Sequence, residues 1–249
     1  MLQNNHDIGW ISADWPAAPH IHAGTTTRIG GVSPAPYDTF NLADHVGDSP
    51  ESVERNRELL CANLGLTVSP CWLQQEHGIR IINLADPYIK QKCDGAYTTR
   101  RNQICVVLTA DCLPLLLCNT QGTQIAAVHV GWRGYSRNII ANAISRFSRY
   151  THDLLAWLGP SISAPNYEVG SEVHIACQQV TGNPDVGFME TRKDHWNADL
   201  AELVRYQLQA YGVRNIHGGN HCTYTDAMQF YSHRRDGVTG RMASLIWME

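Results

Sequence analysis

The sequence predicts a mixed α+β fold in one domain over residues 1–249, an α/β/β/α-type layered sandwich in which helices flank mixed β-sheets. Three observations predict this class. Runs rich in Val, Ile and Leu follow one another through the middle of the chain instead of strictly alternating with helices. Segments with helical spacing of apolar residues lie before and after those runs. No repeat, low-complexity tract or flexible linker divides the chain, and its length suits one large domain.

Four segments are expected to form helices. The first follows a Gly- and Pro-rich loop segment at 25–48. Ser49 can cap this helix, Pro50 suits its first position, and Gly65 suits the point just past its end. The segment 136–147 places Ile, Ala and Phe at helical spacing. The other expected helices are 171–180 and 199–212.

Strands are expected where short runs of branched apolar residues are bounded by turn residues. The expected strands are 71–74, 79–84, 104–109, 113–118, 124–130, 154–160 and 243–248. The loop segment 25–48 is long for a connection in a compact protein, and loops of that length are more often functional than idle.

Charge and hydropathy exclude several classes of function. With 19 Lys and Arg against 23 Asp and Glu, no basic surface for nucleic acid or an anionic membrane is expected. No apolar run reaches the about 18 residues of a membrane span, and the start of the chain lacks the pattern of a secretory signal. Eight cysteines are scattered without the spacing of a disulfide scaffold, which indicates a reducing, cytoplasmic compartment.

Three short segments each contain one residue of a type that binds metals, at a point where an expected strand ends in a turn. They are "QQEHG" with His77, "TADCLP" with Cys112 and "AAVHVGWRG" with His129. Two imidazoles and one thiolate suit zinc, with the fourth position left to water or substrate, and copper accepts the same donors. The residue types alone also allow a buried cysteine beside two histidines that only hydrogen-bond in place.

The same segments resemble the YfiH family, whose members are described as laccase-domain or polyphenol oxidase proteins and as purine nucleoside phosphorylases. The resemblance runs almost end to end through "TTRIGGVS", "PYDTFNLADHVGD", "WLQQEHG", "LTADCLPLLLCN", "AAVHVGWRG", "WLGPSISAPNYEVG", "CTYTD" and "FYSHRRDGVTGRMASLIW". It implies a metal ion bound by His77, Cys112 and His129 as the catalytic centre, for which the donor types indicate zinc, with copper as the alternative. It also implies phosphorolysis of adenosine, inosine and methylthioadenosine, with deamination of adenosine as a second activity.

Departures from the family pattern leave the three ligands in place. Glu76 stands where the family usually has an apolar residue, and no role is assigned to it. Asp94 is retained in "CDGAYTT", a segment that otherwise differs from the family.

Phosphorolysis needs inorganic phosphate, which arginine binds through its planar fork of donors. Arg28 in "TTRIGG" and Arg133 in "GWRG" are the candidates for docking phosphate, although each could equally be an exposed arginine. Asn41 is a candidate for binding the ribose or the base. The expected partners are therefore purine nucleosides and phosphate, and no feature specifies an oligomeric state.

Three other classes of protein remain open. A metal-free cysteine hydrolase would use Cys112 as nucleophile and a histidine as base, for example on an amide of a peptidoglycan precursor. A copper-dependent polyphenol oxidase is expected to be weak at most, because the only His-x-His pair among 12 histidines is His20 and His22. A non-catalytic binding protein is disfavoured by the concentration of polar motifs.

Several remaining polar residues have simpler expectations. His217 and His221 in "HGGNH" are expected in a loop without metal, and Arg234 and Arg235 in "SHRRDG" are expected to be solvated. Further candidates to approach or line the site are His45, Tyr167 and Glu168.

Overall fold

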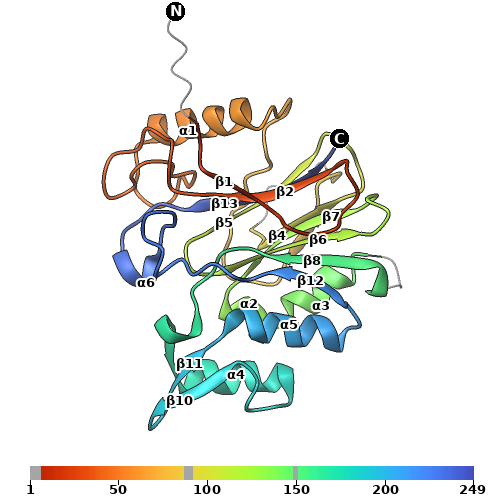
Figure 1. Ribbon diagram of the computed structural model, residues 1–249, viewed down its shortest axis with the longest axis vertical. Helices are drawn as coiled ribbons and strands as arrows, with labels where there is room; N and C mark the ends of the chain where they lie inside the picture. Colours follow the sequence, from red (N-terminus) through yellow and green to blue (C-terminus); the bar gives the residue numbers. More distant parts are fainter. Residues whose placement is uncertain (1–6, 87–91, 148–150) are drawn as a thin grey trace, which may run out of the picture.

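Two large β-sheets packed face to face form the centre of the computed structural model, which describes residues 7–86, 92–147 and 151–249 (Figure 1). The predicted α+β class, with mixed sheets and flanking helices, is confirmed. Residues 1–6, part of the stretch inspected for a secretory signal, lie outside the described residues. Within the described ranges, no helix has both the length and the apolar character to cross a membrane.

The first sheet has four antiparallel strands in the order β1-β2-β13-β5. Its strands are β1 (Trp10–Ser12), β2 (Ile21–Thr26), β13 (Met242–Met248) and β5 (Ile104–Thr109). The two ends of the chain therefore meet at its centre, where β2 and β13 pair side by side.

The second sheet is mixed and has six strands in the order β12-β8-β6-β7-β4-β3. Its strands are β12 (Asn215–Gly218), β8 (Leu154–Leu158), β6 (Leu113–Asn119), β7 (Ile125–Val130), β4 (Gly95–Thr98) and β3 (Ile81–Asn83). The two outermost pairs are parallel and the inner pairs are antiparallel.

Strand β6 explains the apolar run "LPLLLC", because both of its faces are buried. Leu116 and Cys118 face the four-stranded sheet and pack in the core between the sheets. Leu115 and Leu117 face the other way, into a core formed with helices. A strand covered on both faces has no solvent-facing positions, so its sequence shows no polar alternation.

Helices cover both outer faces, which gives the α/β/β/α order of layers seen from top to bottom of Figure 1. Helix α1 packs Leu59 and Leu60 against the outer face of the four-stranded sheet. The helices on the other side bury Ile140 and Val204 against the six-stranded sheet. The helices are α1 (Pro50–Asn63), α2 (Trp132–Ser136), α3 (Ile139–Ile144), α4 (Ser171–Thr181), α5 (Leu200–Ala210) and α6 (His233–Asp236).

A small third sheet lies beside α4 at the far end of the molecule from α1 (Figure 1). Its strand order is β10-β11-β9, and its strands are β9 (Glu168–Gly170), β10 (Phe188–Arg192) and β11 (His195–Ala198). The sequence did not predict this sheet, because its strands are short, have few buried residues and lack the apolar runs of the central strands.

Helix α1 follows its sequence signals closely. The hydroxyl of Ser49 accepts a hydrogen bond from the Ser52 N–H, and Pro50 occupies the first turn. Gly65 adopts a left-handed φ of 64° just beyond the helix, a conformation that costs glycine little.

Two of the expected elements are wrong in detail. The expected helix over 136–147 is shortened to α3 (Ile139–Ile144), because Asn138 has a left-handed φ of 66° that interrupts helical hydrogen bonding and separates α3 from α2. The expected strand at 71–74 is reduced to a single bridge at Cys71. Beyond that bridge the Gln75 side chain replaces backbone pairing, since its amide bonds both the N–H and the carbonyl of Leu108.

Candidate functional site

The pairing of β6 with β7 brings two of the three expected ligands together. Leu113 lies opposite Val130 in this antiparallel pair, so Cys112 and Gly131 flank the same end of the hairpin. His129 precedes Val130 in β7 and lies opposite Pro114. The 17 residues that separate Cys112 from His129 in the sequence are thus spanned by one hairpin.

His77 joins this pair from the loop before β3. The ligand atoms of His77, Cys112 and His129 all lie within 4.8 Å of one another. His77 Nε2 is 3.9 Å from the sulfur of Cys112, and the two imidazole rings meet edge to face with centroids 4.7 Å apart. Two imidazole nitrogens and one sulfur at such separations fit one tetrahedral zinc ion with an open fourth position.

Asp94 holds both histidines in place from the residue before β4. Its buried carboxylate accepts the Nδ1–H of His129 at 2.8 Å and the main-chain N–H of His77 at 2.8 Å. It also accepts the N–H groups of Gly78 at 2.6 Å and Glu76 at 3.2 Å. Because Nδ1 of His129 donates to Asp94, its Nε2 is left to bind a metal, which is the usual carboxylate–histidine–metal arrangement.

The backbone is strained at two residues of the site, a ligand and the residue before another ligand. His77 has a φ of 59° and Asp111 a φ of 92°, values that L-residues seldom adopt. The Asp111 carboxylate secures its conformation by accepting the Thr223 hydroxyl at 2.7 Å and the Arg234 N–H at 2.6 Å. Strain that is held in this way by surrounding contacts is typical of functional sites.

The cluster favours a thiolate when no metal is bound. Burial alone raises the pKa of the Cys112 thiol, but the charge and hydrogen bonds of His129 and His77 outweigh burial and lower that pKa to about 6. Burial alone lowers the pKa of His129, yet the Cys112 thiolate and Asp94 raise it to about 9. The thiolate is the form of cysteine that binds metals, whereas His129 must release a proton to become a ligand.

A cavity of about 500 Å³ opens onto His77 and Cys112. This size falls in the range that accommodates a small organic ligand. Besides His77, the basic lining residues are His45, Arg133, His233, Arg234 and Arg241. The apolar and aromatic lining residues include Leu108, Trp132, Ile162, Tyr167 and Leu200. The cavity therefore combines positive charge with flat hydrophobic surfaces beside the cluster.

The structure brings one of the three expected substrate-binding residues to this cavity. Arg133 lines it, with its guanidinium carbon 4.5 Å from the centroid of the Trp132 ring. Arg28 is not among the lining residues and donates instead to the carbonyl of Asp38 at 2.9 Å and of Ala227 at 3.1 Å. Asn41 is fully buried and holds the main chain around it.

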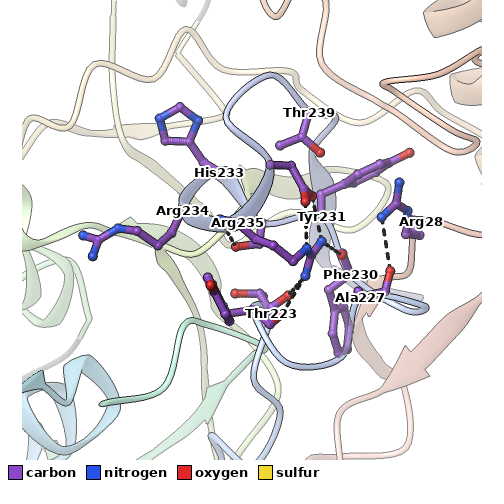
Figure 2. A network of polar contacts seen from close by, with 12 residues as sticks. Arg28, Thr223, Ala227, Phe230, Tyr231, His233, Arg234, Arg235 and Thr239 are labelled. Atoms are coloured by element: carbon purple, nitrogen blue, oxygen red, sulfur yellow. Dashed lines mark hydrogen bonds and ion pairs between the residues drawn. The ribbon is translucent and has the colours of Figure 1, made fainter. Parts of the chain in front are cut away.

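The segment 232–237 contributes residues that the sequence analysis did not assign to the site. His233 and Arg234 line the cavity, whereas Arg235 points into the neighbouring loop (Figure 2). Arg235 is not solvated as expected: its side chain is 17% exposed and donates to the carbonyls of Thr223 and Phe230. The sequence signal that could have identified these residues is the pair of adjacent arginines in a segment that resembles the family.

Of the other candidate site residues, two line the cavity and two do not. His45 and Tyr167 line the cavity, and neither Glu168 nor Glu76 does. Glu76 lies 3.8 Å from the ammonium group of Lys92.

The other histidine pairs form no second metal cluster among the described residues. His22 stacks on Trp247, and His20 bonds the carbonyl of Gly122. His217, expected in a loop, lies in β12.

Gly131 is a test of how closely the three ligands are packed. A Cβ at this position would lie 3.1 Å from the Cys112 sulfur and 3.1 Å from Cδ2 of His77. Its φ of −89° suits any residue, so Gly131→Ala is expected to displace the ligands without straining the backbone. Zinc affinity should fall about 10-fold or more, as it does when the supports of metal ligands are disturbed.

Gly170→Ala is the matched control, because Gly170 also precedes a helix with a φ of −89° and has no atom within 4 Å of the added Cβ. Competition with a chromogenic chelator measures both affinities. Equal zinc affinity in the two variants would contradict the close packing of the ligands.

One protein-family model matches almost the whole chain. Residues 22–249 match the family model described as multi-copper polyphenol oxidoreductase laccase. A protein of Escherichia coli K12 named purine nucleoside phosphorylase YfiH is 43% identical over 239 residues, covering 96% of this chain and 98% of the relative. A purine nucleoside phosphorylase of Haemophilus influenzae is 42% identical over 243 residues, covering 96% and 99%.

Solved structures show the same architecture. A Neisseria meningitidis protein of the family model DUF152 superposes with a TM-score of 0.91 at 40% identity, over 97% of this chain and 99% of that one. YlmD from Geobacillus stearothermophilus superposes with a TM-score of 0.88 at 29% identity, over 97% and 96%.

Proposed function

The chain belongs to the YfiH family of laccase-like proteins, and from that premise we propose that it is a metal-dependent purine nucleoside phosphorylase. The observation that carries the proposal is the cluster of His77, Cys112 and His129 at the wall of a cavity of about 500 Å³ lined by arginines and aromatic rings. The proposed substrates are adenosine, inosine and methylthioadenosine together with inorganic phosphate. A cytoplasmic location belongs to the proposal, since all eight cysteines are free.

His77, Cys112 and His129 would hold zinc, with copper as the alternative, and Asp94 would fix the tautomer of His129. When bound, the ion supplies a Lewis acid beside the substrate. The buried carboxylate of Asp94 also fixes the loop of His77 through main-chain hydrogen bonds. The protein therefore keeps the three donors in position before substrate arrives.

The cavity walls suit the two substrates of phosphorolysis. In this reaction an oxygen of phosphate bonds to C1′ of the ribose while the bond from C1′ to the purine nitrogen breaks. The purine leaves with its electron pair and takes up a proton. Arginine side chains can hold the phosphate against C1′, and the ring faces of Trp132 and Tyr167 can pack against the purine.

Deamination of adenosine is the proposed second activity of the same site. Here water adds at C6 of the purine and ammonia leaves, so no phosphate is consumed. Zinc deaminases carry out this chemistry with a metal and a nearby acid-base residue. Adenosine bound in this cavity would place either its C1′ next to phosphate or its C6 next to the attacking water.

Incubation of zinc-loaded protein with adenosine, with and without phosphate, tests both activities. Adenine is expected only when phosphate is present, whereas inosine is expected in both samples if the site deaminates. Chromatography separates adenine, inosine and hypoxanthine, and chelator-treated protein serves as the control. A zinc-loaded sample that releases no purine base with phosphate present would overturn the phosphorylase.

One observation favours a second candidate function, a metal-free cysteine hydrolase acting on an amide. Cys112, His129 and Asp94 lie in the order of nucleophile, base and orienting carboxylate, and the pKa of Cys112 is lowered to about 6. Removal of metal separates the two models. Chelation should abolish phosphorolysis, but it should leave a thiol hydrolase active on a cell-wall amide.

Polyphenol oxidation with copper is at most a weak side activity in this proposal. A four-copper oxidase needs many histidine ligands, and the described residues form one cluster with two.

A further inference from the structure

We propose that Arg241 and Arg234 form the phosphate-binding subsite of the cavity. This inference rests on the proposed phosphorolysis and assigns the anion to residues other than the sequence-based candidates Arg28 and Arg133. Arg133 and Arg234 are both exposed, but the Arg234 guanidinium is held by a hydrogen bond to the Glu168 carbonyl at 3.0 Å. Arg133 stacks on Trp132 and makes no side-chain hydrogen bond among the described contacts, so it is left for contacts with the nucleoside.

The charge of the cavity wall calls for an anionic ligand. Three arginines line the cavity, whereas the single carboxylate among the described lining residues is Asp111. Both oxygens of Asp111 already accept hydrogen bonds, from the Thr223 hydroxyl at 2.7 Å and from the Arg234 main-chain N–H at 2.6 Å. Even with the Cys112 thiolate counted, the three arginines give the cavity an excess of positive charge beside His77, Cys112 and His129.

Arg241 is a partly buried cation whose described contacts leave its charge unpaired. Its Nη1 donates to the carbonyl oxygens of Thr239 at 2.8 Å and Gly240 at 2.9 Å. Neither acceptor carries a charge, and no described carboxylate lies within ion-pair distance of Arg241. Burial lowers the pKa of Arg241, and the charges of Cys112 and Asp111 oppose that effect. A bound anion would relieve the cost of burying this cation.

Asn41 fixes the position of Arg241. Its Oδ1 accepts the main-chain N–H of Arg241 at 3.0 Å, and its own amide donates to the carboxylate of Asp48 at 2.9 Å. Asn41 has no exposed surface, so this support is rigid. The buried asparagine thus acts on the cavity through Arg241, in place of direct contact with ribose or base.

Arg234 presents a second guanidinium to the same cavity. Its Nη1 donates to the Glu168 carbonyl at 3.0 Å, and its guanidinium carbon lies 5.1 Å from the centroid of the Tyr167 ring. No ion pair of Arg234 occurs among the described residues, whereas the adjacent Arg235 pairs with Asp236 at 2.7 Å. In Figure 2 the two neighbouring arginines point in different directions, Arg235 into its loop and Arg234 away from it.

Two guanidinium groups suit a tetrahedral phosphate, because each can donate two parallel hydrogen bonds to its oxygens. Both groups share one cavity with Cys112. Phosphate held there lies beside His77, Cys112 and His129, where the ribose C1′ of a bound nucleoside must also be placed for the displacement to occur.

Phosphate binding to the zinc-loaded protein tests the subsite without the need for turnover. Phosphate should raise the thermal unfolding midpoint of the wild-type protein, and a titration gives its dissociation constant. Arg241→Gln and Arg234→Gln are each expected to weaken phosphate binding about 30-fold, the loss typical of a charge-assisted contact. The KM for phosphate should rise in parallel, and the KM for adenosine should change much less.

Arg241→Lys and Arg55→Gln complete the experiment. Lysine keeps the charge but not the fork, so partial recovery of phosphate binding is expected. Arg55 is an exposed residue of α1 with the same change of charge, and its variant should bind phosphate as the wild type does.

Wild-type phosphate affinity in both glutamine variants, or no phosphate binding by the wild-type protein, would overturn the subsite. Arginine-dependent phosphate binding in a protein that releases no adenine would support the subsite and overturn the phosphorylase instead. If Arg241→Gln fails to fold, Arg234→Gln and Arg241→Lys still decide the question.

Discussion

Replacement of Cys112 with alanine is expected to remove zinc binding and to lower kcat/KM for phosphorolysis by at least about 10³-fold. The sulfur is one of three ligands, so its loss leaves two imidazoles that cannot hold the ion at its position. A Lewis acid in an active site contributes several kcal/mol to catalysis, and about 4 kcal/mol corresponds to that factor. Metal analysis of the purified variant and adenine release in the presence of phosphate measure the two effects.

Cys61→Ala is the matched control for this variant. Cys61 is a partly exposed cysteine in α1, where alanine is well accommodated, and it lies outside the described cavity lining. Its variant should keep wild-type zinc content and activity. Phosphorolysis at the wild-type rate in Cys112→Ala would show that the reaction does not depend on the cluster.

Asp94→Asn is expected to lower zinc affinity and phosphorolysis by about 10–100-fold while also destabilising the fold. Zinc affinity falls because the carboxylate orients His129 and raises its basicity, and loss of such a partner typically has this effect. Stability falls because Asp94 accepts the N–H groups of His77 and Gly78 through different oxygens, whereas asparagine offers one. Each buried donor left unsatisfied costs about 1–3 kcal/mol.

Asp48→Asn separates the two effects of Asp94→Asn. Asp48 is also buried, and its carboxylate accepts hydrogen bonds from Ser33 at 2.6 Å and from the Ser49 N–H at 2.8 Å. Its variant should lose a similar amount of stability in urea denaturation and keep its zinc affinity. If Asp94→Asn loses stability alone, with unchanged zinc affinity, Asp94 does not support the metal centre.

The central strands could be predicted because their sequences reflect burial directly. Strand β6 is apolar throughout since it is buried on both faces, and α1 has its cap and its terminal glycine in the usual places. The break at Asn138 was not predictable from spacing, because the apolar residues on both sides continue at helical intervals. The third sheet was missed because short, exposed strands leave no such pattern.

The candidate site shows the same division. His77, Cys112 and His129 could be proposed because their side chains carry the chemistry itself. The role of Asp94 depends on the pairing of β4 with β7, which places it beside His129 although 35 residues separate them. The arginines could not be ranked from the sequence. The structure occupies Arg28 with carbonyl acceptors and brings Arg241, from the far end of the chain, to the cavity.

The β6–β7 hairpin determines how the protein would exchange its metal ion. His129 lies within β7 and Cys112 directly precedes β6, so both are held at the end of a sheet that is complete without any ion, whereas His77 lies in a longer loop before β3. In zinc fingers, by contrast, removal of the metal unfolds the chain. This protein should therefore exchange its ion by opening one loop, so that loading, loss and replacement of the metal are local events that the rest of the molecule survives.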